Sequence, residues 1–107
     1  MDQQYLWWLY LRAKQDLILE LIERVYSLII HALETTDVEL ANVLLSEAKD
    51  VLTRAREHYS ILEDFFPHLK VTQHLGERLS EVVEDYQRVS NLVCESEKQT
   101  GIMPASS

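Results

Sequence analysis

The sequence is poor in the residues that interrupt regular secondary structure, and this scarcity favours helices. Its 107 residues include only two glycines and two prolines, the residues that mark the turns of sheet proteins and the linkers of disordered chains. Because 47% of the residues are hydrophobic, the composition also argues against a disordered chain. We therefore expect one folded all-α domain, since a chain of this length provides a single hydrophobic core.

Cysteine and basic residues are scarce as well. The single cysteine, Cys94, excludes an internal disulfide and fits a reducing compartment. Ten basic against 18 acidic residues give a formal net charge of -8, which argues against DNA, RNA or anionic lipid as a partner, because those surfaces are bound by clusters of Lys and Arg. We expect an intracellular, cytoplasmic protein that binds neither nucleic acid nor membrane.

The sequence has no long uninterrupted hydrophobic run. The apolar stretch at residues 5–11 is preceded by Asp2 and followed by Arg12, Lys14 and Asp16. It lacks the basic start and the small-residue cleavage site of a signal peptide, and it is far shorter than the ~20 residues that a membrane span requires. We interpret it as the beginning of a helix.

Hydrophobic periodicity predicts three helices, at about residues 3–34, 37–66 and 72–98, in one domain spanning 1–98. Thr36 and Glu39 have the spacing of a capping box that would open the second helix, and Pro67 should end it. Residues 99–107 are expected to form a flexible tail. Because the connectors are short, the expected fold is an elongated antiparallel three-helix bundle with coiled-coil-like packing.

The predicted second and third helices have regular heptads of apolar residues. On the second helix, small residues occupy successive a positions and permit close helix approach. On the third, Gly76 should weaken the first turns by about 1 kcal/mol relative to alanine. The a positions of the second helix are Ala41, Ala48, Ala55 and Leu62.

The predicted first helix carries more apolar surface than a three-helix protein of this size can bury. Its core-facing stripe includes Leu11, Ile18, Val25 and Ala32. A second stripe adjoins it and widens the apolar arc to roughly 200°, against the ~100° that a surface helix needs. Either a partner protein or a splayed third helix covers this second stripe, and we expect a partner. Its members are Leu19, Tyr26, Ile30 and Leu33.

Seven of the nine aromatic residues should gather at one pole of the bundle. Folding the second helix back on the first brings Phe65 and Phe66 close to Trp7 and Trp8. These residues either close the end of the bundle or form a partner-binding end, and the two interpretations agree if both tryptophans face inward. The outward-facing candidates for partner binding would then be Leu6 and Leu9.

The histidines and cysteine do not form a convincing chemical site. His74 and Glu77 are three residues apart, and His68 lies near the same pole. His68 is not placed well enough to serve as the third ligand of a zinc site, and no Glu-x-x-His spacing occurs. Cys94 has acidic neighbours, which raise rather than lower the pKa of a thiol. We therefore expect no metal, no cofactor and no enzymatic activity.

One spacing is similar to that of an enzyme family. Arg24 and His31 have the R-x6-H spacing of helical-bundle ribonucleases of the HEPN type. The resemblance covers these two residues only, and the acidic composition opposes an RNA substrate. A small HEPN-like ribonuclease using this pair is the alternative hypothesis.

The sequence as a whole favours a non-enzymatic helical protein–protein interaction module, either a scaffold or a subunit of a complex. Its partner would be another copy, giving a homodimer, or a heterologous helical protein. The apolar residues that the first helix presents in excess of its own core would bind this partner. They are Leu6, Trp7, Trp8, Leu9, Leu19, Tyr26, Ile30 and Leu33.

Overall fold

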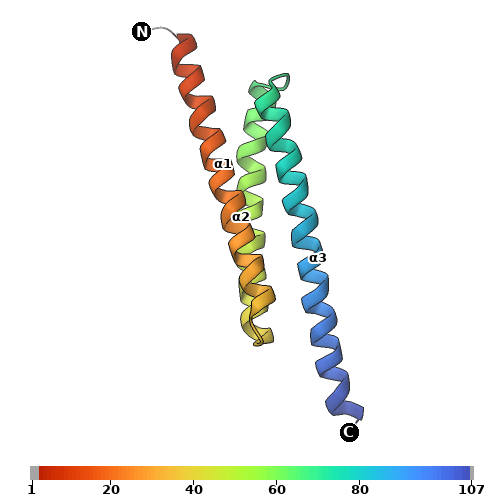
Figure 1. Cartoon of the computed structure of the whole chain (residues 1–107). Coiled ribbons are helices and arrows are strands. Elements are labelled where there is room, and N and C mark those ends of the chain that lie inside the picture. Colours follow the sequence, from red (N-terminus) through yellow and green to blue (C-terminus); the bar gives the residue numbers. More distant parts are fainter. Residues whose placement is uncertain (1–2, 107) are drawn as a thin grey trace.

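The chain folds into three long helices that run up, down and up beside one another (Figure 1). The structure is a computed structural model that describes residues 3–106, with side chains for residues 3–96. The helices are α1 (Gln3–Glu34), α2 (Val38–Phe65) and α3 (Lys70–Ser106). The molecule measures 72 × 20 × 16 Å along its principal axes. The predicted elongated antiparallel three-helix bundle is confirmed.

The two connections between the helices are short, and identifiable residues begin and end the helices on either side of them. Asp37, rather than the predicted Thr36, caps α2, because its side-chain Oδ1 accepts hydrogen bonds from the backbone N–H groups of Glu39 and Leu40 at 3.0 and 3.3 Å. At the other end, α2 stops at Phe65, two residues before Pro67. The connector to α3 then spans four residues, 66–69.

The third helix is longer than expected at both ends. It begins at Lys70, before the predicted start at residue 72, and it continues to Ser106, past the predicted end at residue 98. The turn-forming residues Gly101 and Pro104 had favoured the earlier end. The flexible tail predicted for 99–107 lies outside the residues whose side chains are described, and it stays a prediction.

The core follows the predicted heptads closely. The four a positions of α2 are at most 3% exposed, and α3 contributes buried leucines and valines at its a and d positions. Among the three alanines, Ala48 and Ala55 have no exposed surface, so they lie at close helix contacts. The buried residues of α1 are Ile18, Leu21, Ile22, Val25, Ile29 and Ala32.

The packing of α2 against α3 explains why residue 76 is a glycine. A Cβ atom at this position would lie 2.5 Å from the hydroxyl oxygen of Tyr59, so the tyrosine ring of α2 packs where a side chain of α3 would otherwise stand. The glycine lowers helix propensity, but it allows close contact between α2 and α3.

The buried core stops well short of the beginning of α1. Ile18 is the first buried residue of this helix among those described, and residues 3–9 are all exposed. Figure 1 shows the reason: the first turns of α1 extend past the connection between α2 and α3, so no third helix lies opposite them. Within the described residues, no helix has the length and apolar character needed to cross a membrane.

Candidate functional site

The overhanging start of α1 and the end of α2 together present an exposed apolar surface, which we call the end patch. It brings together residues from α1, the last turn of α2 and the connector that follows. All seven are large hydrophobic residues between 39% and 58% exposed. The end patch consists of Tyr5, Leu6, Trp7, Trp8, Leu9, Phe65 and Leu69.

Trp7 lies at the centre of the aromatic contacts that organise this surface. Its ring centroid is 5.7 Å from that of Phe65 and 6.1 Å from that of Phe66, so it joins α1 to the end of α2. Tyr5 and Trp8 stack at a centroid distance of 6.5 Å. Six of the seven aromatic residues expected at this pole are joined by ring contacts, whereas the seventh, Tyr59, packs against Gly76 farther along α2.

The two interpretations of this pole agree only if both tryptophans face inward, and the structure leaves both tryptophans about half exposed. Trp7 is 47% exposed and Trp8 is 51% exposed, although both occupy core positions of the heptad. The reason is the overhang of α1, because a heptad position is buried only where neighbouring helices stand opposite it. The aromatic residues therefore do not form a buried core that closes this end of the bundle.

The end patch is hollowed on one side and flanked by cations. A hollow of about 480 Å³ lies between the two helices, lined by Trp7, Trp8, Phe65 and Leu69 of the end patch together with Gln4, Leu11 and Phe66. The guanidinium carbon of Arg12 lies 5.5 Å from the centre of the Trp8 ring, and the Lys14 ammonium lies 5.7 Å from the centre of the Tyr10 ring. These cation–π contacts hold both cations at the edge of the apolar surface.

The second stripe of α1 divides into two parts. Leu19 and Tyr26 are partly buried and pack against the core. Ile30 and Leu33 remain 51% and 52% exposed. The bundle itself covers the first two residues, and the other two form a smaller exposed apolar site at the opposite end of α1 from the end patch.

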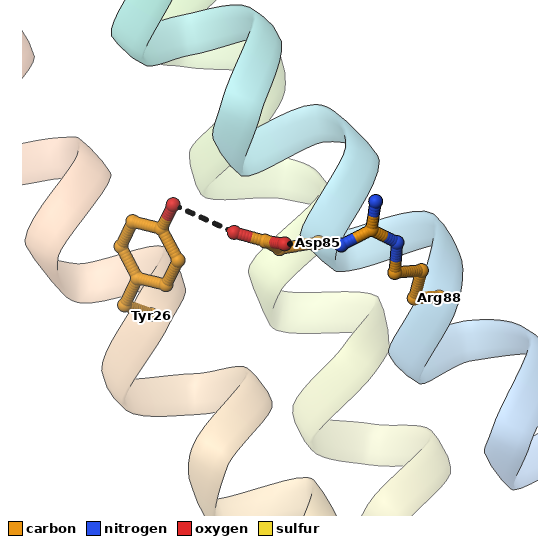
Figure 2. A network of polar contacts seen from close by, with 3 residues as sticks. All are labelled: Tyr26, Asp85 and Arg88. Atoms are coloured by element: carbon orange, nitrogen blue, oxygen red, sulfur yellow. Dashed lines mark hydrogen bonds and ion pairs between the residues drawn. The ribbon is translucent and has the colours of Figure 1, made fainter.

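Tyr26 is tied to α3 by a hydrogen bond (Figure 2). Its hydroxyl donates to Asp85 Oδ2 at 2.9 Å, and Arg88 Nη1 lies 3.4 Å from the other carboxylate oxygen. Burial, together with the hydrogen bond to Asp85 and the negative charge of Asp85, raises the pKa of Tyr26 to about 12. Tyr26 thus serves the α1–α3 contact within one chain.

This raised pKa predicts a loss of stability at high pH. The unfolded phenol ionises near pH 10 and the folded one near 12, so the stability that Tyr26 provides is complete below pH 10 and falls as the pH rises to 12. The free energy of unfolding of the wild type should fall more steeply over this window than that of Tyr26→Phe, measured by urea denaturation. Ultraviolet titration of Asp85→Asn should show the phenol ionising at lower pH. Equal slopes for wild type and Tyr26→Phe would contradict this.

The Arg24 and His31 pair does not form a catalytic pocket within one chain. They lie seven positions apart along α1, which is about 10 Å of helix. Arg24 Nη2 instead contacts Glu47 Oε1 of α2 at 3.2 Å. His31 lines a hollow that also contains Glu23 and Glu34, whose carboxylates would repel a phosphate backbone. No observation here favours the ribonuclease hypothesis.

The histidines and the cysteine are not brought together. His58 Nδ1 is hydrogen-bonded to Lys14 Nζ at 2.9 Å, and burial, reinforced by this cation, lowers the pKa of His58. Cys94 is exposed on α3. Among the described side chains, those of residues 3–96, no group of three or more His, Cys, Asp or Glu is arranged to hold a metal ion.

Comparison with known proteins finds no matching protein family, no similar curated protein and no similar solved structure. The geometry of the chain is therefore the basis for its functional assignment.

Two features of the surface could not be found from residue patterns. Leu69 belongs to the end patch, although its sequence context indicated only a connector after Pro67. A hollow of about 920 Å³ also lies between α2 and α3, where Tyr59 packs beside Gly76. Gly76 is the only feature of the sequence that points to this groove. Helix propensity explains only its effect on α3 and does not predict that Tyr59 packs beside it.

Proposed function

We propose that the chain is a non-enzymatic helical interaction module, a scaffold or complex subunit, that binds a protein through the end patch. The observation that carries this proposal is the exposure of seven large apolar residues gathered at one end of the molecule. Monomeric proteins seldom leave an apolar patch larger than a few hundred Å² in contact with water. Half-exposed aromatic residues are also the side chains that contribute most to protein interfaces.

The test is affinity capture with a matched pair of variants. Leu6→Gln/Leu9→Gln removes two exposed side chains from the end patch, and Val43→Gln/Leu92→Gln removes two exposed side chains from α2 and α3. Glutamine keeps a high helix propensity in both cases. The wild type and the second variant should retain the same protein, whether another copy or a different chain, and the first variant should lose it.

The proposal is wrong if the wild type retains no protein of either kind. It is also wrong if both double variants retain the same protein equally well. Circular dichroism and thermal melting of both variants exclude unfolding as the cause of any loss.

A further inference from the structure

We infer that Lys14 of α1 and His58 of α2 form a pH-sensitive clasp, which holds the start of α1 against α2 at neutral pH and releases it in mild acid. Release would change the arrangement of the end patch. The clasp would thereby regulate partner binding, and this regulatory role rests on the proposed function. Two features of the structure support the clasp: one hydrogen bond, and a row of contacts that joins this bond to the end patch.

The hydrogen bond requires a neutral histidine. Lys14 Nζ lies 2.9 Å from His58 Nδ1, and a lysine ammonium can only donate, because it has N–H groups and no acceptor. Nδ1 must therefore carry a lone pair, so the proton of the neutral ring lies on Nε2. When His58 takes up a second proton, both ring nitrogens become donors and two positive charges face each other. Protonation of His58 therefore breaks the bond.

The surroundings of His58 keep the ring neutral at neutral pH. The side chain is partly buried, and burial lowers its pKa, with the positive charge of Lys14 acting in the same direction. Glu57, its neighbour on α2, acts in the opposite direction. Among the described residues, Lys14 and Glu57 are the charged groups that shift this pKa, and α3 contributes none. The bond is therefore complete above pH 6.5 and is lost as the pH falls through a lower value.

A row of contacts joins the clasp to the end patch. The Lys14 ammonium lies 5.7 Å from the centre of the Tyr10 ring, and this ring meets Trp7 edge to face, with centroids 6.0 Å apart. Trp7 in turn lies 5.7 Å from Phe65. His58 and Phe65 are seven positions apart on α2, which is about 10 Å of helix. A movement of Lys14 therefore changes the surroundings of Trp7.

The clasp lies where α1 has little other support. Residues 3–9 are exposed, and Ile18 is the first buried residue of α1 among those described. Lys14 lies between these two parts of the helix, so its bond to His58 ties α1 to α2 just inside the overhang. Segments with few buried contacts are those that open most easily. Loss of the bond should let the overhang move away from α2, and Trp7 should then meet more water.

The first experiment follows the tryptophan emission of the purified chain from about pH 7.5 to 5, a range in which histidine titrates and most carboxylates stay charged. Trp7 and Trp8 are the only tryptophans in the chain, so the emission reports on the end patch alone. It should shift to longer wavelength on acidification, with a midpoint below pH 6.5. His58→Gln should show no shift, because the amide oxygen accepts a hydrogen bond from Lys14 throughout this range.

Two other histidines provide matched controls. His31 is exposed in the last turn of α1, and His68 is exposed in the connector next to Leu69 of the end patch. His31→Gln and His68→Gln should both keep the emission shift of the wild type. Lys14→Met keeps an unbranched side chain and removes the ammonium, so it should abolish the shift.

Nitrogen NMR of the histidine rings tests the bond itself. The His58 signal is assigned by its absence from His58→Gln. At neutral pH it should show the proton on Nε2 and none on Nδ1, as the hydrogen bond requires. Its titration midpoint should lie below pH 6.5 in the wild type and should rise in Lys14→Met, where burial still lowers the pKa.

The capture experiment connects the clasp with the proposed function. Between the neutral and the acid end of the same pH range, the amount of retained protein should fall further for the wild type than for His58→Gln. The emission and NMR measurements need no partner. If the wild type retains no protein at neutral pH, the proposed function is wrong, and these two measurements still decide whether the clasp exists.

Three results would overturn the inference. One is a wild-type emission that stays constant over the whole range. Another is a shift that persists in His58→Gln or disappears in His68→Gln, because a different group then titrates. The third is a His58 ring with its proton on Nδ1 at neutral pH, or one whose midpoint lies at or above pH 6.5.

Discussion

Shortening Ile22 to alanine should lower the free energy of unfolding by about 2 to 5 kcal/mol, because the change removes buried carbon atoms and leaves a cavity. Ile22 has no exposed surface and lies in the middle of the core. The same change at Ile30 should cost about 0.5 kcal/mol or less, since surface substitutions seldom cost more. Ile30 is 51% exposed on the same helix.

The two isoleucines form a matched pair. Both changes raise helix propensity equally, so the difference between them measures tertiary burial alone. Urea denaturation of the dilute protein, followed by circular dichroism, gives both values. Equal losses would place Ile30 in the core, and they would mean that the second stripe of α1 belongs entirely to the bundle.

Burial could be predicted from the sequence inside the bundle but not at its exposed edges. Within the bundle, heptad spacing predicted burial well, because three helices of similar length face one another there. Of the four residues expected on one core-facing stripe, Ile18, Val25 and Ala32 are buried, and Leu11 is partly buried. Local patterns suffice wherever every helix has neighbours.

The overhang could not be predicted in this way. Trp7 and Trp8 have the correct heptad positions for a core, but their burial depends on how far α2 and α3 extend beside them. That relative shift along the bundle is set by packing of all three helices together. Consequently the sequence predicted that aromatic residues gather at this pole, but it could not decide whether Trp7 and Trp8 close the core or stay exposed.

Two polar residues at the beginnings of helices, Thr72 and Asp37, are also features that local patterns missed. Thr72 occupies an a position of α3 and is 1% exposed, and its hydroxyl has no hydrogen-bond partner among the described residues. A buried hydroxyl of this kind lowers stability, so periodicity would favour an apolar residue there. The choice of Asp37 over Thr36 as the cap likewise depends on where the chain turns.

The hydrogen bond between Tyr26 and Asp85 shows how one polar member of the second stripe of α1 becomes part of the bundle. A tyrosine can bury its ring against the core and still satisfy its hydroxyl on a neighbouring helix. Apolar periodicity cannot distinguish this case from an exposed tyrosine. Ile30 and Leu33 lie on the next turns of α1 and stay exposed.

The alanines of α2 give the second large expected effect. Replacing Ala48 with leucine should lower the free energy of unfolding by about 1 to 3 kcal/mol, because extra methylene groups must enter a close-packed contact. Ala48 has no exposed surface, and α2 has close neighbours on both sides. Thermal and urea denaturation measure the loss.

Ser46→Leu is the matched control, since Ser46 lies two residues earlier on the exposed face of α2. Its leucine would extend into solvent and change the free energy of unfolding by about 0.5 kcal/mol or less. If Ala48→Leu were as stable as the wild type, the core at this level would contain room for a leucine side chain. The close packing of α2 against its neighbours would then be contradicted. The alignment of α1 and α2 that places Trp7 beside Phe65 and Phe66, and so forms the end patch, would be contradicted as well.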